Sequence, residues 1–209
     1  MNVLFLTNEK AKDRDYLANF IRDNGDRVVI CWNNINEEFI RKNKIDFLIS
    51  YRYQQLIKEP LLTYFEGRMV NCHPSFLPWC RGYYPNAWSF LDDTPKGVSV
   101  LFIDAGIDTG DLIAQTELFF DSHVTLRESY NICHDTIQKL FMDNWNKIRE
   151  GTCSRIKQVG KGTLHYKKDN VLFMDCLKNG WDTTIHEFKN NYHKKQNQNK
   201  YSYEKILVH

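Results

Sequence analysis

The sequence contains no paired-cysteine motif, no long apolar run and no excess of one charge. Its six cysteines stand singly, without a C-x-x-C pair, which gives no support to a zinc knuckle or a thioredoxin-type site. Apolar runs such as Val3–Leu6 and Val100–Ile103 are far shorter than the roughly 18 residues of a membrane span. Lys and Arg number 28 against 26 Asp and Glu, which excludes a mainly basic nucleic-acid surface. The N-terminus also lacks the basic start and cleavage site of a secretory signal, so we predict a cytoplasmic protein with reduced thiols.

The first 72 residues alternate short apolar runs with helix-like stretches. Strands are predicted at Val3–Leu6, Val28–Cys31, Phe47–Ser50 and Met69–Cys72. Between them, apolar spacing predicts one helix from about residue 16 to the cap at Gly25, and a second around residues 35–40. Parallel neighbouring strands need crossover helices, so this order predicts an α/β fold with a mostly parallel, Rossmann-like sheet and helices on both faces.

The pattern changes after residue 72. A loop rich in Pro, Gly and aromatic residues runs from Pro74 to Pro85. Two strands follow at Gly97–Ile103 and Asp111–Glu117, and the short connection between them predicts an antiparallel pair. Thr125 and Glu128 form a capping box that begins a long amphipathic helix, which we expect to end at Gly151.

The remaining residues do not continue this pattern. Strands are expected at 164–168 and 171–176, then a short helix from residues 181–184, capped by Asp182 or Thr183. Lys189–Lys200 is almost wholly polar and is interpreted as a solvated loop. The apolar end Ile206–Val208 is interpreted as a last strand or a subunit contact. The sequence thus divides into a domain over 1–151 and a small α+β C-terminal extension over 152–209.

One group of polar residues has the composition of an acyl-transfer site. Asn71 and His73 lie two residues apart in a strand and therefore share one face, at the end where open α/β sheets bind ligands. Asp108 lies in a turn flanked by Gly106 and Gly110, and glycines let backbone approach a ligand closely. An amide can stabilise an oxyanion, an imidazole can move a proton and a carboxylate can orient that imidazole. On spacing alone, a packed histidine and an ordinary turn explain the same residues better than a catalytic set does.

The string Asn-Cys-His-Pro-Ser-Phe-Leu-Pro at 71–78 resembles the N-x-H-P-S-x-L-P motif of the folate-dependent formyltransferases. That motif is followed by D-x-G, and Asp108 here comes 35 residues after His73. The resemblance covers roughly residues 1–150 and implies the formyltransferase fold, with residues 1–151 as the catalytic domain. It also implies attack of an amine on the formyl carbon of 10-formyltetrahydrofolate, without a metal. Asn71 would bind the oxyanion, His73 would act as a base or a second oxyanion donor, and Asp108 would hold His73 or an ordered water.

The same resemblance places the folate between two loops. One contains Tyr53, Gln55, Leu56 and Ile57, and the other Asp104, Gly106 and Ile107. Core packing is a competing interpretation for Tyr53 and Leu56.

Residues 79–88 and 162–169 are similar to the R-G-x-x-P-N-x-W and G-T-x-H-x-x-x-D stretches of the sugar-nucleotide N-formyltransferases. Arg81 would then pair with a pyrophosphate, and Tyr83, Tyr84 or Trp88 would stack on a base or a sugar. A packed aromatic loop is the alternative for each ring. The first strand is followed by no glycine-rich loop, which disfavours glycinamide ribonucleotide as substrate.

The substrate that this branch implies is dTDP-4-amino-4,6-dideoxyglucose, for surface polysaccharide such as the O-antigen of lipopolysaccharide. Its 3-amino isomer and glycinamide ribonucleotide are the alternatives, and a non-catalytic folate- or nucleotide-binding module is an alternative of another class. The expected partners are a small nucleotide-sugar and a second copy of the chain in a homodimer, with no nucleic acid and no membrane.

Overall fold

The computed structural model describes residues 1–9 and 16–206, with side chains described as far as residue 198. Its strands are β1 (Asn2–Leu6), β2 (Arg27–Cys31), β3 (Phe47–Tyr51), β4 (Met69–His73), β5 (Arg81–Gly82), β6 (Lys96–Phe102), β7 (Leu112–Leu118) and β8 (Leu164–His165). Its α-helices are α1 (Tyr16–Asp23), α2 (Glu37–Asn43), α3 (Leu61–Tyr64), α4 (Pro85–Leu91), α5 (Leu126–Glu150) and α6 (Ile185–Ile206). Short 3-10 helices span Lys167–Leu172, Met174–Cys176 and Gly180–Asp182.

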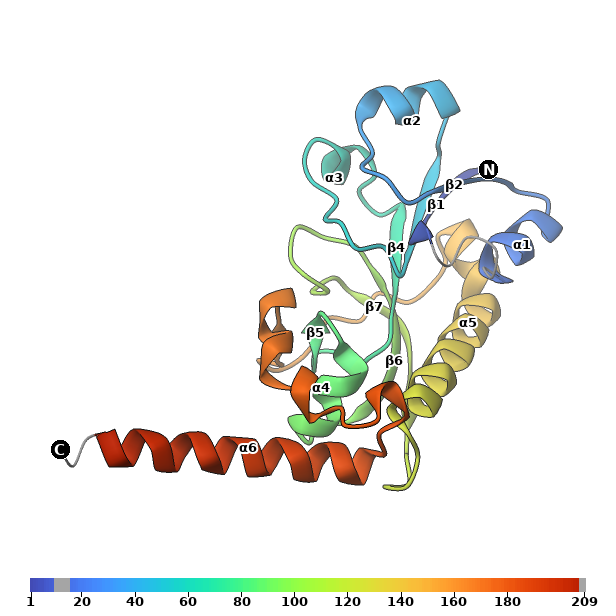
Figure 1. The fold of residues 1–209 in the computed structure, drawn as a ribbon. Coiled ribbons are helices and arrows are strands. Elements are labelled where there is room, and N and C mark those ends of the chain that lie inside the picture. The colour runs from blue at the N-terminus through green and yellow to red at the C-terminus, as the bar shows by residue number, and fades with distance from the viewer. Residues whose placement is uncertain (10–15, 207–209) are drawn as a thin grey trace.

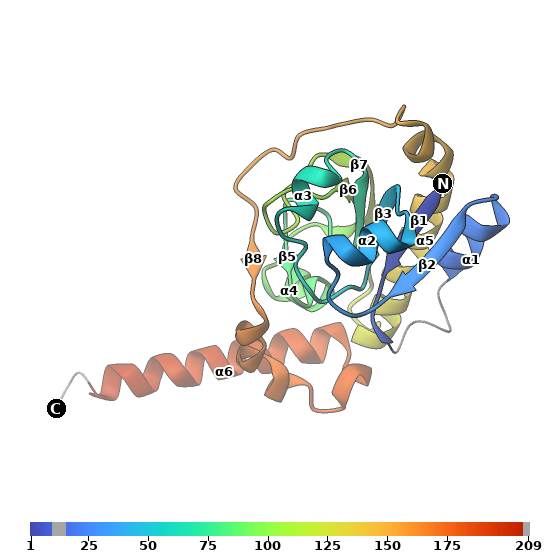
Figure 2. The ribbon, with the colours of Figure 1, turned by 90° about the horizontal axis from the view of Figure 1, so that it is seen from above.

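A six-stranded sheet with the order β2-β1-β3-β4-β6-β7 forms the centre of the fold (Figure 1). The strands from β2 to β4 are mutually parallel, whereas β6 is antiparallel to both β4 and β7. Helices cover both faces of this sheet, as Figure 2 shows from above. The predicted α/β fold class, the mostly parallel sheet and the antiparallel last pair are confirmed.

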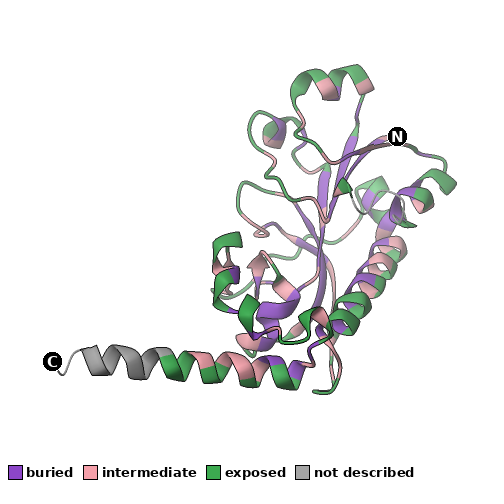
Figure 3. Ribbon diagram, in the orientation of Figure 1, coloured by how far each residue is buried: buried purple, intermediate pink, exposed green. Residues whose placement is uncertain are grey.

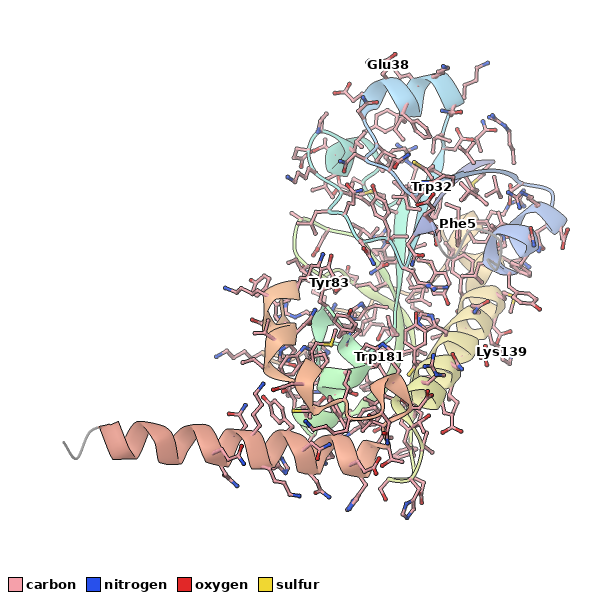
Figure 4. All side chains as sticks on the ribbon, in the orientation of Figure 1. Phe5, Trp32, Glu38, Tyr83, Lys139 and Trp181 are labelled. Carbon is pink, nitrogen blue, oxygen red and sulfur yellow. The ribbon has the colours of Figure 1, made fainter. Side chains whose placement is uncertain are left out.

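The first face of the sheet packs against α1 and α5. Its core contains Phe5, Val70, Cys72 and Val100 from the strands and Trp145 from α5. The strands are buried along most of their length, and the outer side of α5 is exposed (Figure 3). In Figure 4, Phe5 lies in the interior, while Lys139 of α5 points into solvent. Burying an aromatic or branched side chain contributes about 1.5–3 kcal/mol, so this cluster is a main source of stability.

The second face of the sheet is only partly covered by helices. Leu4, Leu48 and Met69 on this face pack against Ile40 of α2 and Leu61 of α3. Asn71 and His73 share the face of Met69, because alternate residues of a strand point the same way. Over this part of β4 the covering segments are the loops 74–82 and 103–111 in place of a helix, which leaves polar side chains on the sheet accessible to loop backbone.

Helix α5 begins and ends at the residues that the sequence predicts. The Thr125 hydroxyl accepts a hydrogen bond from the backbone N–H of Glu128, and the Glu128 carboxylate accepts one from the N–H of Thr125. Gly151 closes the helix in the left-handed conformation with a φ of 71°. The predicted capping box is confirmed.

The segment after residue 152 differs from the expectation. Of the two expected strands, only Leu164–His165 forms, and residues 167–176 form 3-10 turns. Lys189–Lys200 is not a loop, because α6 runs through it. The cap of α6 is Thr184, which forms a capping box with Glu187, and neither Asp182 nor Thr183 takes that position. Ile206 ends α6, and the rest of the apolar end, Leu207 and Val208, lies outside the described residues.

Among the residues that the structure describes, no helix has the length and apolar character needed to cross a membrane.

Candidate active site

Asn71, His73 and Asp108 lie together over the carboxyl-terminal half of β4. The amide nitrogen of Asn71 donates to Asp108 Oδ1 at 2.9 Å. The second carboxylate oxygen, Asp108 Oδ2, lies 3.5 Å from Nδ1 of His73. The His73 side chain is 6% exposed and that of Asp108 13%, so the carboxylate faces the imidazole in a setting with little screening by water. The structure thus brings together the three residues predicted as a catalytic set.

The short strand β5 and the residue before it supply two backbone groups to this set. The backbone N–H of Gly82 donates to Asp108 Oδ2 at 2.9 Å, and the carbonyl of Cys80 lies 3.1 Å from His73 Nε2. A carbonyl oxygen only accepts hydrogen bonds, so Nε2 carries a hydrogen in this contact. In the neutral ring, Nδ1 is then the nitrogen with a free lone pair, and it is the nitrogen beside Asp108. Residue types in the sequence gave no signal for these two backbone contacts.

The backbone around β5 adopts an uncommon conformation. Cys80, Gly82 and Tyr84 have φ values of 55°, 86° and 51°, all in the left-handed region. For a residue other than glycine this costs about 1–3 kcal/mol, so the surrounding structure must hold the segment in place.

The loop that carries Asp108 is fixed by side chains on either side. Gln158 donates to the carbonyls of Asp108 and Gly110, each at 2.9 Å. Within the loop, Asp104 Oδ1 accepts from the N–H of Gly106 and from the hydroxyl of Thr109. The Asp104 carboxylate, predicted as part of a cofactor pocket, therefore shapes the turn. Ile107, in the same loop, is half-buried.

The other predicted cofactor loop lies beside the site. Tyr53 and Ile57 pack with Ile103, the residue just before the Asp104 turn, in one apolar cluster. Tyr53, Leu56 and Ile57 also line a cavity of about 400 Å³ that reaches the start of α2. Leu56 is 64% exposed there and Gln55 is exposed as well, so both can contact a ligand. The core-packing interpretation fits Tyr53, whose hydroxyl donates to the carbonyl of Asn33, but not Leu56.

Of the predicted sugar-nucleotide residues, Arg81 and Tyr83 are hydrogen-bonded to backbone carbonyls, whereas Tyr84 stacks on another ring. The Arg81 guanidinium donates to the carbonyls of Thr163 and Lys161, and the Tyr83 hydroxyl donates to the carbonyl of Gln54. Tyr84 is 37% exposed and stacks on Trp181 with a centroid distance of 5.6 Å. Tyr83 and Trp181 both lie on the side of the molecule where β5 and the 3-10 helices meet (Figure 4).

Trp88 requires a correction. It is only 2% exposed, and its ring stacks on His165 at 3.9 Å between centroids, nearly parallel at 3°. It belongs to the core between α4 and α6, so it cannot stack on a base or a sugar without unpacking that core.

A second buried polar cluster joins β3 to α5, and the sequence analysis did not identify it. The Tyr51 hydroxyl accepts from Gln138 and is hydrogen-bonded to Nδ1 of His134 at 2.6 Å. Burial, and then the nearby charge of Arg52, lower the pKa of His134 to about 3. The imidazole is therefore neutral at physiological pH. Only the apolar spacing of α5 was visible in the sequence, and that spacing does not distinguish a polar core residue.

Comparisons with known proteins identify the family of the chain. The family model described as formyl transferase matches residues 21–144, more than half of the chain. Among solved structures, the formyltransferase PseJ from Anoxybacillus kamchatkensis, in complex with UDP-4,6-dideoxy-4-formamido-L-AltNAc and tetrahydrofolate, superposes with a TM-score of 0.84. It is 37% identical, and the match covers 90% of this chain and 97% of that one.

Two curated relatives match over a shorter region. The methionyl-tRNA formyltransferase of Finegoldia magna is 35% identical over 125 residues, which cover 57% of this chain and 39% of that protein. The dTDP-4-amino-4,6-dideoxyglucose formyltransferase of Mycobacterium bovis is 31% identical over 127 residues, covering 60% of this chain and 53% of that protein. The matched region thus spans about half or less of these two relatives.

Proposed function

The chain belongs to the formyl transferase family, and we propose that it transfers a formyl group from 10-formyltetrahydrofolate to the amine of a nucleotide-linked amino-dideoxy sugar. The observation that carries the proposal is the contact of Asn71, His73 and Asp108 on one face of β4. An amide, an imidazole and a carboxylate in mutual contact supply the donor, the base and the counter-charge that formyl transfer to an amine requires.

His73 is the base in this proposal, and Nδ1 is the reacting atom. The hydrogen on Nε2 is held by the Cys80 carbonyl, so the lone pair of the neutral ring is on Nδ1. When Nδ1 takes a proton from the attacking amine, the imidazolium that results is 3.5 Å from Asp108 Oδ2 and is paired with it. The geometry thus favours the role of base over that of a second oxyanion donor.

Asn71 stabilises the negative charge that develops on the formyl oxygen. Its amide nitrogen carries two hydrogens, and one of them is donated to Asp108 Oδ1. That bond fixes the direction of the amide and leaves the second hydrogen for the oxyanion. A preoriented donor of this kind is worth about 10²–10³ in kcat.

The folate, as co-substrate, supplies the formyl carbon. The residues around Leu56 fit such a ligand, because a partly apolar ring system would cover the exposed Leu56 side chain and fill the neighbouring cavity of about 400 Å³. We assign the contacts of this pocket to Tyr53, Gln55, Leu56 and Ile57. We also assign folate contacts to the backbone of Asp104, Gly106 and Ile107, which lie outside the lining of that cavity.

Two of the three relatives named above are described with a 4,6-dideoxy sugar that carries nitrogen at C4 and is linked to a pyrimidine nucleoside diphosphate. PseJ was solved with a 4-formamido sugar on UDP, and the Mycobacterium bovis relative is named for a 4-amino sugar on dTDP. We propose this class, with dTDP-4-amino-4,6-dideoxyglucose as one member and the UDP sugar as the other. We also propose that the formylated sugar enters surface polysaccharide. Tyr84, which is 37% exposed and stacks on Trp181, is the ring that we assign to base or sugar stacking, and we assign Arg81 to the pyrophosphate.

A formyl-transfer assay tests the proposal. Purified protein would be incubated with 10-formyltetrahydrofolate and one of four amines, and the product followed by mass spectrometry. The amines are the dTDP- and UDP-linked 4-amino sugars, the dTDP-linked 3-amino isomer and glycinamide ribonucleotide. Turnover of a 4-amino sugar alone is expected. Turnover of the 3-amino isomer alone would correct the position of the amine, and folate binding without turnover of any amine would favour a non-catalytic binding module.

We also propose that residues 1–151 form the catalytic unit, that 152–209 form an extension and that the protein is a homodimer. Sedimentation equilibrium tests whether the protein is a homodimer.

A further inference from the structure

The segment 162–165 lies outside the region matched by the family model, yet it is bonded to the loop that completes the active site. Strand β8 pairs in parallel with β5, Arg81 with Leu164 and Gly82 with His165. The Thr163 hydroxyl accepts from the N–H of Cys80 at 2.8 Å, and the His165 carbonyl accepts from the N–H of Tyr83 at 2.9 Å. The peptide units of Cys80 and Gly82, which contact His73 and Asp108, are thus held from behind by β8.

The fit between the two segments is close. A methyl group built on Gly82 would lie 2.3 Å from the carbonyl oxygen of His165. One built on Gly162 would lie 2.1 Å from the carbonyl oxygen of Pro78. Any shift of β8 relative to β5 would therefore move the left-handed backbone at Cys80 and Gly82, because no free space separates the two.

The side chain of His165 fastens β8 to α4. Its Nε2 donates to Asp92 Oδ2, at the end of α4, over 2.7 Å. Its ring lies flat against Trp88. The His165 and Asp92 side chains are 16% and 22% exposed, so the pair is largely shielded from water. The Trp88 contact alone would permit sliding in the plane of the rings, and the bond to Asp92 removes that freedom.

We propose that His165 is a positioning residue, whose bond to Asp92 holds β8, and through β8 the Cys80 carbonyl and the Gly82 N–H, in register with His73 and Asp108. The inference rests on the proposed function for its effect on turnover. This role of His165, the histidine of the G-T-x-H stretch, is separate from binding of the sugar or the folate. Thr163 is the second part of the same device, because its hydroxyl binds the N–H of Cys80.

Three variants separate the bond from the packing. His165→Phe keeps a flat ring on Trp88 and loses the donor, Asp92→Ala removes the acceptor, and His165→Gln restores a donor. His186→Phe is the matched control, since His186 is exposed on α6 and its imidazole is hydrogen-bonded to the neighbouring Asn190. His165→Phe and Asp92→Ala should each lower kcat about 10- to 100-fold, the range for a small misplacement of reacting groups, while the KM for folate stays within about twofold. The double variant should be no slower than either single one, because both substitutions remove the same bond.

A second readout does not require turnover. The ring ¹⁵N signals of His73, identified among the seven histidines by their loss in His73→Gln, report the hydrogen bond to the Cys80 carbonyl. In ligand-free protein these signals should move in His165→Phe, move less in His165→Gln and stay in place in His186→Phe. If the wild-type protein transfers no formyl group, the proposed function fails and these signals still decide the present inference.

Unchanged His73 signals together with a kcat within twofold of wild type would overturn it. So would a stoichiometric transition metal in the purified protein that is lost in His165→Phe. The ligand atoms of Cys80, Asp92 and His165 lie within 4.8 Å of one another, and such a metal would make the three residues a metal site.

Discussion

Asp108→Asn removes one charge from the centre of the candidate site and changes almost nothing else. The side chain keeps its size, and Asn tolerates the left-handed backbone that residue 108 adopts with a φ of 53°. The carboxylate accepts from Gly82 N–H on one oxygen and from the Asn71 amide on the other. The new amide has only one oxygen. The backbone N–H of Gly82 cannot turn, so that oxygen must stay with it, and the new NH₂ group must face Asn71.

Two losses follow from this arrangement. Asn71 must flip its amide to present an oxygen to the new donor, which withdraws its nitrogen from the oxyanion and costs about 10²–10³ in kcat. The imidazolium of His73 also loses its counter-charge, and a hydrogen bond to a charged partner is worth about 1.5–3 kcal/mol. Together the two losses predict a kcat lower by about 10³–10⁵, with the KM values little changed.

The assay is steady-state formyl transfer, with thermal unfolding measured in parallel. Asp143→Asn is the matched control, since it makes the same change on the exposed side of α5, where Asp143 pairs with Lys139. The control should keep full activity. A kcat within tenfold of wild type in Asp108→Asn would refute the assigned roles of Asn71 and His73.

Three further predictions concern other parts of the fold. Because burial lowers the pKa of His134 to about 3 from 6.5, its contribution to stability is complete above pH 6.5 and is lost as the pH falls toward 3. The loss of unfolding free energy is about 2 kcal/mol at pH 5. The urea midpoint of His134→Gln should therefore change less between pH 7 and pH 5 than that of the wild type. An equal change in both proteins would contradict the prediction. Gly82→Ala should lower kcat at least about tenfold, whereas Gly25→Ala, with a similar φ of 84° but no atom within 4 Å, should cost only about 1 kcal/mol of stability and no activity. An equal effect of Gly82→Ala and Gly25→Ala on kcat would contradict the close fit at Gly82. Burial raises the pKa of Cys80 to about 11 and that of Cys133 to about 12, and of the six cysteines only Cys153 is not buried. A charged thiol reagent should therefore label at most one thiol per native chain within minutes, and rapid labelling of several would contradict the packing.

The parts of the fold that could be predicted are those with a repeating apolar pattern or a local cap. The four parallel strands are short apolar runs with polar boundaries, and α5 carries a capping box at Thr125. Helix α6 has a capping box at Thr184 and Glu187, which the sequence analysis did not use, but it has no sustained apolar pattern. Among its side chains up to residue 198, Ile185, Phe188 and Tyr192 belong to the apolar core. The segment Lys189–Lys200 is almost wholly polar, so a helix and a solvated loop have the same pattern there.

The candidate site was predicted to the extent that side chains make it. Asn71 and His73 share a face because they are two residues apart, and the structure places Asp108 against both. The prediction that Trp88 stacks on a base or a sugar was wrong, because an aromatic loop has the same composition whether its rings face a ligand or the core. The contacts of the Cys80 carbonyl and the Gly82 N–H are made by backbone groups, which nearly all residues share, so the residue types in the sequence do not predict them.

Those two backbone contacts also determine which kinds of sequence change the site can survive. A substitution at Cys80 replaces a thiol but leaves the carbonyl where it is, and the same holds for most positions of the loop from Pro74 to Tyr83. A one-residue deletion or insertion in that loop displaces the Cys80 carbonyl and the Gly82 N–H relative to His73 and Asp108. The loop is therefore constrained in length more than in composition. Related chains can differ in the sequence of this loop while the number of residues between His73 and Gly82 stays fixed.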